Sequence, residues 1–152
     1  MPKILFVCLG NICRSPMAEY VMKDLVKKHG VANRYTIDSA GTYGPNAGDP
    51  VHPGTRKILA EHSVPCPPRK ARTLGRNDHE EYDWIIGMEE SNLHAIARIF
   101  HGRGHEKIRK LLDFTPKGGD IDDPWYTDDF ESTWRDVQEG CQGLLRALET
   151  KK

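Results

Sequence analysis

A cysteine and an arginine near the start of the chain have types and a spacing suited to phosphate chemistry. Cys8 and Arg14 are separated by five residues, and Ser15 and Pro16 follow directly. A loop of that length can curl around a tetrahedral anion, so that the thiol and the guanidinium reach the same ligand. Arginine offers a planar, bidentate fork to phosphate oxygens, and a thiolate is favoured at a helix N-terminus beside arginine. The pattern predicts a phosphate-binding loop with Cys8 as the nucleophile at its floor.

The residues around this loop predict the elements that position it. Residues 4–7 form a short apolar run typical of a buried strand. Ser15 can cap a helix and Pro16 suits its first position, so a helix is expected over residues 16–28. The loop amides and the helix N-terminus would together bind an anion, and the Ser15 hydroxyl could donate to the thiolate. The remaining members of the expected phosphate-binding loop are Leu9, Gly10, Asn11, Ile12 and Cys13.

Other interpretations of these side chains remain open at this point. A free cysteine on a buried strand is usually a small apolar residue. Cys8 and Cys13 could open a plant-type iron–sulfur set, but Pro16 stands where the next cysteine is needed. Zinc pairs usually lie closer together. His101 and His105 have metal-like spacing, but two glycines between them argue against a helix and no third ligand is evident, so no metal is expected.

A second candidate region lies in the long loop expected over residues 115–129. Transfer of a phosphoryl group to a thiolate requires a proton for the leaving oxygen and later a base for the attacking water. One carboxylic acid can serve both needs in turn, and Asp123 is the best candidate, with Asp122 as its rival. Trp125 and Tyr126 could wall a slot for a flat phenyl ring. Taken alone, the same stretch could be a solvated acidic turn with its aromatic residues packed inward.

Length, charge and cysteine usage bound the class of protein. The 152 residues predict one domain over residues 1–152. Lys+Arg and Asp+Glu number 22 each, so the formal charge is zero and neither a nucleic acid nor a membrane partner is expected. No apolar run is long enough for a signal peptide or a bilayer span. Four irregularly spaced cysteines favour reduced thiols and a cytoplasmic location.

Strands and helices alternate along the chain. Further strands are expected at three places: residues 34–39, residues 84–88, and around Ile108, Leu111 and Leu112. Further helices are expected over residues 54–62, over residues 89–100, and from Phe130 to Leu148. Cys141 lies on the apolar face of the last helix and is interpreted as a core residue. This alternation predicts a parallel sheet covered on both faces, which binds ligands at its carboxyl edge.

The two loops together resemble those of the low-molecular-weight protein tyrosine phosphatases. The resemblance rests on Cys8-Leu9-Gly10-Asn11-Ile12-Cys13-Arg14-Ser15-Pro16 and on Asp123-Pro124-Trp125-Tyr126. It extends to Asp38-Ser39-Ala40-Gly41-Thr42, to Met88-Glu89-Glu90-Ser91-Asn92-Leu93 and to the chain length. It implies an α/β fold with a flavodoxin-like, four-stranded parallel sheet of order 2-1-3-4, helices on both faces, and neither metal nor cofactor.

By motif position, the resemblance also implies roles for single residues. Cys8 would form a phosphocysteine intermediate during hydrolysis of phosphotyrosine on a protein or of small aryl phosphates. Arg14 and the loop amides would bind the phosphoryl oxygens, inorganic phosphate or similar oxyanions. Asp123, which directly precedes a proline as the family's acid does, would be the general acid and then the base. Asn11 would hold the loop in shape through a hydrogen bond to Ser39.

This sequence departs from the family pattern at three places. Many animal members carry a histidine near the position of Pro67-Pro68 that supports the phosphate loop, and none is evident here. Those members also have a large residue that lines the cleft after the Ser39 strand, for which Tyr43 and Pro45 are the candidates. Trp125 stands where a tyrosine is common, which predicts a changed selectivity for the ring.

Two other functions share parts of this pattern. An arsenate reductase of similar fold also uses a Cys-x5-Arg loop but passes a disulfide along further cysteines, and residues 69–140 contain none. An idle phosphate-binding module is disfavoured by the intact set of Cys8, Arg14 and Asp123. Cys13 adds a separate redox hypothesis, in which its thiol captures oxidised Cys8 as a disulfide. The alternative is that Cys13 simply packs under the loop.

Overall fold

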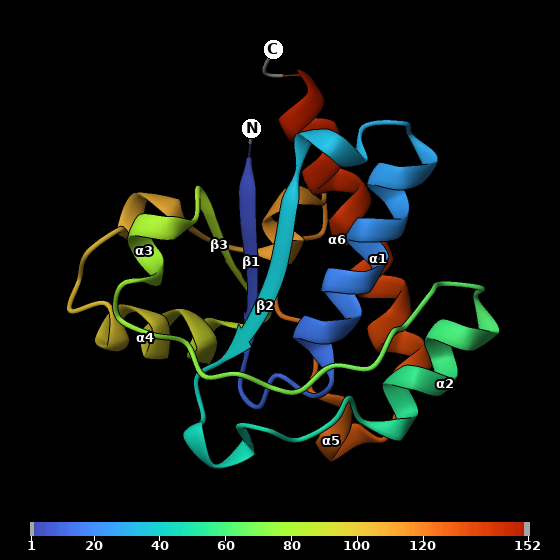
Figure 1. The fold of residues 1–152 in the computed structure, drawn as a ribbon, viewed down its shortest axis with the longest axis horizontal. Coiled ribbons are helices and arrows are strands. Elements are labelled where there is room, and N and C mark those ends of the chain that lie inside the picture. Colours follow the sequence, from blue (N-terminus) through green and yellow to red (C-terminus); the bar gives the residue numbers. More distant parts are fainter. Residues whose placement is uncertain (1, 151–152) are drawn as a thin grey trace.

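The protein contains a four-stranded sheet, which the computed structural model describes within residues 2–150 (Figure 1). The strands are β1 (Lys3–Cys8), β2 (Thr36–Gly41), β3 (Trp84–Gly87) and β4 (Ile108–Lys110). All neighbouring strands pair in parallel, in the order β2-β1-β3-β4. The predicted parallel sheet of order 2-1-3-4 is therefore confirmed.

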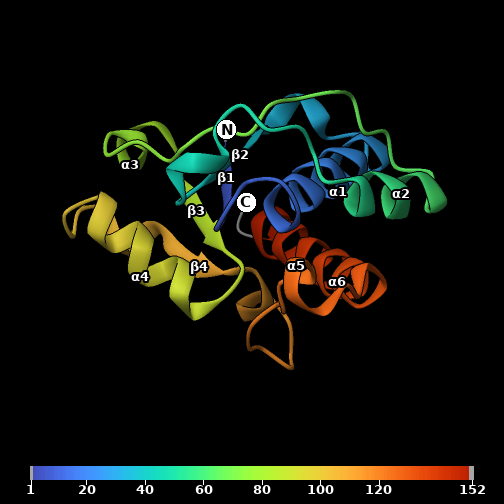
Figure 2. The same ribbon diagram turned by 90° about the horizontal axis from the view of Figure 1, so that it is seen from below.

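Helices cover both faces of this sheet (Figures 1 and 2). One face carries α1 (Arg14–Lys28), α2 (Pro53–Glu61) and α6 (Phe130–Thr150), and the other carries α4 (Glu90–Ile99). Two short helices, α3 (Asp78–Glu81) and α5 (Pro124–Thr127), interrupt the longer connections. The loop after β1 and the helix α5 meet at the carboxyl edge of the sheet, at the bottom of Figure 1.

The central strand β1 joins the two cores. Its side chains alternate between the faces, with Ile4 and Phe6 in one apolar cluster and Leu5 and Val7 in the other. All four side chains are fully buried, and burying one such side chain contributes roughly 1.5–3 kcal/mol. The strand thereby gives a rigid base to the loop that starts at its end.

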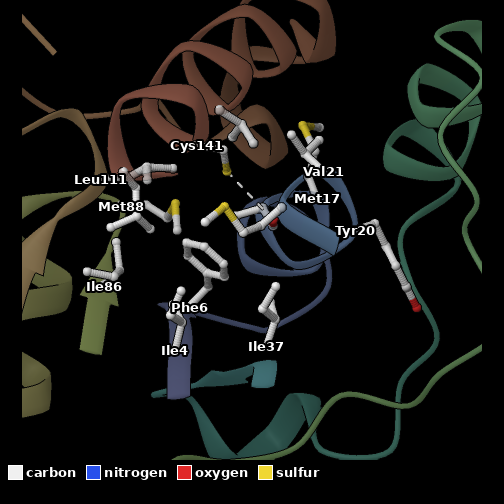
Figure 3. Packing of buried hydrophobic residues seen from close by; sticks show 14 of the residues in the cluster. Ile4, Phe6, Met17, Tyr20, Val21, Ile37, Ile86, Met88, Leu111 and Cys141 are labelled. Carbon is white, nitrogen blue, oxygen red and sulfur yellow. Dashed lines mark hydrogen bonds between the residues drawn. The ribbon is translucent and has the colours of Figure 1, made fainter. Parts of the chain in front are cut away.

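The larger core confirms the interpretation of Cys141. Figure 3 shows Cys141 of α6 facing α1, close to Met17. Cys141 is fully buried, and its thiol donates to the carbonyl of Ala18 at 3.7 Å. Burial raises the pKa of this thiol. Cys141 is therefore a core residue.

Three of the differences from the sequence predictions concern α1, β2 and β4. Helix α1 begins at Arg14 with no side-chain cap, so Ser15 lies inside the first turn and its predicted capping role is wrong. Strand β2 begins and ends later in the sequence than the expected range of residues 34–39, because Arg34 belongs to a 3₁₀ turn (Ala32–Arg34). The predicted fourth strand ends before Leu111 and Leu112, which form a 3₁₀ turn (Leu111–Phe114) packed against α6. Their apolar character reflects burial in the core, which does not require a strand.

Candidate active site

The loop after β1 presents unpaired amides at the carboxyl edge of the sheet. Backbone amides from outside the loop donate hydrogen bonds to its carbonyl oxygens: the amides of Thr42, Tyr43 and His52 donate to the carbonyls of residues 8, 9 and 12 at 3.0, 2.8 and 2.8 Å. The amides of residues 12–15, in contrast, have no acceptor among the described residues. These N–H groups lie at the start of α1, where they are available to an anion.

Two backbone features let the loop take this shape. Asn11 has a φ of 58°, in the left-handed region that asparagine tolerates better than most residues. Gly41 of β2 lies directly behind the loop, where a Cβ atom would stand 2.8 Å from the Leu9 oxygen and 2.9 Å from the Gly10 carbonyl carbon. Any side chain at Gly41 would therefore push the loop away from the sheet.

The Cys8 thiol is oriented by a hydrogen-bond network whose directions follow from the donors. The Asn11 amide N–H donates to Cys8 Sγ at 3.3 Å, and Ser15 Oγ lies 3.0 Å from the same sulfur. Asn11 Oδ1 accepts from the Arg72 amide at 2.9 Å, so Nδ2 of Asn11 donates to Ser15 Oγ at 2.8 Å. Ser15 Oγ therefore donates a hydrogen bond to Cys8 Sγ. The alternative acceptor, the Ala40 oxygen, is farther away at 3.5 Å.

The same network continues to a buried carboxylate. Ser39 Oγ donates to Glu19 Oε1 at 2.5 Å and accepts from Asn11 Nδ2 at 3.0 Å and from Arg69 Nη1 at 2.8 Å. The structure thus contains the predicted hydrogen bond between Asn11 and Ser39. Glu19 is 5% exposed and Arg69 Nε lies 3.7 Å from its Oε1. A buried carboxylate requires a cation. Lys23 Nζ is the nearer one, 2.6 Å from Glu19 Oε2, and Arg69 adds a second beside the hydroxyl that holds the loop.

Arg14 donates hydrogen bonds to two segments that are distant in the sequence. Its guanidinium is buried and donates to the Ile121 oxygen at 2.8 Å, to Asp123 Oδ2 at 3.3 Å and to Glu89 Oε2. Burial lowers the pKa of Arg14, but the charges of Cys8, Asp123 and Glu89 outweigh this and raise it above its ordinary value. Arg14 is therefore held as a cation with one edge fixed by acceptors.

Asp123 reaches the site from the start of α5. Its Oδ1 accepts from the Trp125 amide at 3.0 Å and caps the short helix, while Oδ2 faces Arg14. Asp123 lines the cavity above Cys8. Asp122 does not line this cavity; it lines a neighbouring hollow of about 440 Å³, which Asp123 also borders and which does not include Cys8. Of the two candidate acids, Asp123 is therefore the one that lines the same cavity as Cys8.

A cavity of about 490 Å³ opens above the thiol. Cys8, Cys13, Arg14 and Asp123 line it, as do the large apolar side chains of Leu9, Ile12, Tyr43, Trp125 and Tyr126. Within residues 2–150 the exposed large hydrophobic side chains are those of Leu9, Tyr43, Trp125 and Tyr126, and all four line this cavity. A charged floor inside an apolar rim suits an aromatic ring that carries an anion.

Two kinds of feature are absent from the part of the chain that the structure describes. No group of three or more His, Cys, Asp or Glu residues within it is arranged to hold a metal ion. None of its helices is long and apolar enough to cross a membrane.

Comparison with known proteins assigns the family. The sequence matches the family described as low molecular weight phosphotyrosine protein phosphatase over residues 3–152. The low molecular weight protein-tyrosine-phosphatase YfkJ of Bacillus subtilis is 36% identical, covering 100% of this chain and 99% of the relative. The chain belongs to the low molecular weight protein tyrosine phosphatase family.

Other relatives agree with this assignment. The phosphatase PtpA of Staphylococcus saprophyticus is 38% identical, covering 97% of this chain and 94% of the relative. The crystal structure of YfkJ superposes with a TM-score of 0.96, covering 100% of this chain and 97% of that one. The phosphatase SP-PTP of Streptococcus pyogenes gives a TM-score of 0.87 at 38% identity, with 97% and 93% covered. The predicted family and phosphotyrosine phosphatase function are confirmed, and an arsenate reductase is not favoured.

The phosphatase contains three site residues that the sequence analysis missed. Glu89 follows β3, and because β3 pairs with β1 the two carboxyl ends meet at one edge, so this signal was available. Glu19 and Arg69 gave no comparable signal, because a single charge on a helix or loop usually belongs to the surface. Arg69 follows the Pro67-Pro68 pair, where the supporting histidine of other family members was sought. Of the two candidates for the cleft residue, Tyr43 lines the cavity and Pro45 does not.

Proposed function

We propose that this phosphatase transfers the phosphoryl group of phosphotyrosine first to Cys8 and then to water. The observation that supports this most directly is the meeting in one cavity of Cys8, Arg14 and Asp123, the last two separated by 109 residues in the sequence. A nucleophile, a cation and a proton donor at one point are the parts that a two-step phosphoryl transfer requires.

In the first step the Cys8 thiolate attacks phosphorus from the floor of the cavity. The S–P bond forms, the bond from phosphorus to the tyrosine oxygen breaks, and the Asp123 carboxyl gives its proton to that oxygen. Arg14 and the free amides of residues 12–15 hold the other phosphoryl oxygens. The Arg14–Asp123 contact gives way as the phosphoryl group takes the guanidinium.

In the second step a water molecule attacks the phosphocysteine. The Asp123 carboxylate accepts a proton from the water, the new O–P bond forms, and the S–P bond breaks. The Ser15 hydroxyl donates a hydrogen bond to Cys8 Sγ and so stabilises the thiolate as it leaves. Orthophosphate departs, and it or similar oxyanions can rebind the same cradle as competitive inhibitors.

The surroundings of the cavity bear on the partner and the location. The apolar rim suits the ring of phosphotyrosine on a protein, with Trp125 and Tyr126 as its walls. The four cysteines are all free thiols, and the nucleophile acts only when reduced. Both points support a phosphotyrosine-containing protein as substrate and a reducing compartment, the cytoplasm.

The phosphocysteine is the decisive species to test. Rapid quenching of wild-type enzyme with a radiolabelled phosphotyrosine peptide should trap label on the protein. Cys8→Ser should trap none and show no turnover, yet keep its circular dichroism spectrum and its binding of orthophosphate, because serine here lacks a base to activate it. Cys66→Ser, in a half-buried position outside the cavity, is the matched control and should remain active. Hydrolysis by Cys8→Ser would remove Cys8 from this role.

A further inference from the structure

A third hollow lies between the start of α3 and the turn after α4, two elements that lie on the left in Figures 1 and 2. It measures about 360 Å³. Its lining consists of Arg76, Asn77, His79, Phe100, His101 and Arg103. None of these residues lines the active-site cavity, and none of them is acidic. The hollow is therefore a separate feature with cationic walls.

The two arginines of this hollow are not neutralised by neighbours. Arg76 and Arg103 are exposed, and neither has an ion-pair partner among residues 2–150. Of the nearby carboxylates, Asp78 pairs with Arg72 at 3.1 Å, whereas Glu80 lies 3.8 Å from the ring of His79, which lines the hollow. Two guanidinium groups thus line one hollow without an ion pair of their own among the described residues.

The two sides of the hollow differ in charge: Asp78, Glu80 and Glu81 lie on the α3 side, and the segment after the start of α4 is basic. Residues 94–110 contain five Lys or Arg and three His but a single acidic residue, Glu106. Residues 113–139, which include the aromatic side of the active site, contain nine Asp or Glu and only two Lys or Arg. The formal charge of zero therefore conceals a basic region and an acidic region. A concentrated basic region attracts anions.

The walls of the hollow are held together by specific packing. His101, Gly102 and Gly104 have φ values of 53°, 77° and 67°, which turn the chain back toward α3. A Cβ atom on Gly104 would stand 2.8 Å from that of His79, so glycine allows this close approach. Lys107 Nζ donates to the His79 oxygen at 2.6 Å, and the Phe100 ring packs edge-on against His79 at 5.5 Å. These contacts therefore hold the backbone segments that carry the cationic side chains in a defined arrangement.

We propose that this hollow binds a phosphate monoester outside the active site. Guanidinium groups match phosphate oxygens in pairs, His79, His101 and the Asn77 amide can add donors, and Phe100 supplies an apolar floor. Two ligands share this chemistry: a second phosphorylated side chain of the protein substrate, and a free small phosphate ester. The first source rests on the proposed function, because it tethers a multiply phosphorylated substrate while the active site hydrolyses another residue. Binding itself does not rest on it.

The first experiment measures binding at the hollow directly. The His79 and His101 ring resonances are followed by NMR while inorganic phosphate is added to the wild-type protein. They should shift saturably, and the shifts should disappear in Arg76→Gln/Arg103→Gln. The control Arg56→Gln/Arg146→Gln removes the same charge from exposed positions on α2 and α6 and should keep them. Resonances that stay still in the wild type, or that shift equally in the first variant, would overturn the proposal.

The second experiment distinguishes the two sources. Values of kcat/KM are compared for p-nitrophenyl phosphate, a singly phosphorylated peptide and a series of doubly phosphorylated peptides with increasing separation. Tethering predicts that one separation gains about tenfold or more, and that Arg76→Gln/Arg103→Gln abolishes only this gain. Phosphate shifts without any gain would assign the hollow to a free phosphate ester. Loss of p-nitrophenyl phosphate turnover in this variant would contradict the separation of the two sites and overturn the proposal.

Discussion

The two segments that form the active site are built in opposite ways. In the phosphate loop, Cys8 is 3% exposed and Arg14 is 2% exposed, and each is held by several hydrogen bonds. In the segment around α5, Trp125 and Tyr126 are 61% and 78% exposed, whereas Ile121 and Asp123 are anchored inward by Arg14. The buried segment can fix the chemistry, and the exposed segment is free to select the ring that enters. Substitutions should therefore lower kcat in the first and raise KM in the second, with Asp123 as the exception.

The exception gives the largest expected effect. Asp123→Ala should slow hydrolysis of phenyl phosphate by about 10²–10⁴-fold, the usual contribution of general acid catalysis. The loss should be smaller for p-nitrophenyl phosphate, whose leaving group hardly needs a proton. Steady-state kinetics with both esters measures this difference.

Asp122→Ala is the matched control for that experiment. It removes an equal charge from the neighbouring position, whose side chain lines the adjacent hollow, so its kcat should stay close to wild type. A large loss with Asp122→Ala and none with Asp123→Ala would reverse the assignment of the acid.

The next effect tests whether the buried segment depends on support from outside it. Arg69→Gln should lower kcat by about tenfold and the unfolding free energy by about 1–3 kcal/mol, because it removes a donor from Ser39 and one of the two cations beside Glu19, the other being Lys23. KM should change little, since Arg69 does not line the cavity. Denaturant unfolding and steady-state kinetics measure the two quantities.

A conservative variant separates charge from hydrogen bonding at this position. Arg69→Lys keeps the cation near Glu19 but loses the fork, so it should recover most of the stability and only part of kcat. Arg34→Gln breaks a distant ion pair with Glu149 and should leave kcat unchanged. An Arg69→Gln enzyme with wild-type kcat would show that Asn11 and Ser39 hold the loop without Arg69.

The same contrast explains what sequence could predict. The phosphate loop could be predicted residue by residue because its strand, cysteine, arginine and helix start are contiguous in the sequence. Glu19 and Arg69 escaped because their roles exist only once β2 brings Ser39 beside Asn11. Leu111 and Leu112 were assigned to a strand because burial against α6 and burial in a sheet leave the same apolar signature. Contacts between distant segments, rather than local patterns, decided each of these cases.

A third effect concerns the two cysteines of the buried loop. Peroxide would oxidise the Cys8 thiolate to a sulfenic acid with release of hydroxide. The Cys13 thiolate would then attack that sulfur, forming the disulfide and releasing hydroxide. After addition of a thiol reductant, wild type should recover several-fold more activity than Cys13→Ser. Equal recovery would leave Cys13 as a packing residue.

The pH dependence of this protection has a definite sign. Burial, together with the charges of Cys8 and Asp123, raises the pKa of the Cys13 thiol to about 12. Below that value the thiolate fraction grows about tenfold for each pH unit, so capture should be faster at pH 8.5 than at pH 7. Quenching peroxide-treated enzyme at intervals and measuring the recoverable fraction tests this. A recoverable fraction that falls with rising pH would contradict attack by Cys13.

The smallest effect belongs to the exposed wall. Trp125→Ala should raise KM for a phosphotyrosine peptide about three- to tenfold, in line with the ~0.5–1.5 kcal/mol of one aromatic contact, and should leave kcat nearly unchanged. Trp125 packs edge-on against His52 at 5.7 Å, so its ring is held in place although it is exposed. Trp125→Phe keeps an aromatic wall and should restore most of the affinity, while inhibition by orthophosphate, which has no ring, should be equal in all three enzymes. A Trp125→Ala enzyme with wild-type KM and a lowered kcat would place this side chain with the chemistry instead, and the division between buried catalysis and exposed selection would fail at that residue.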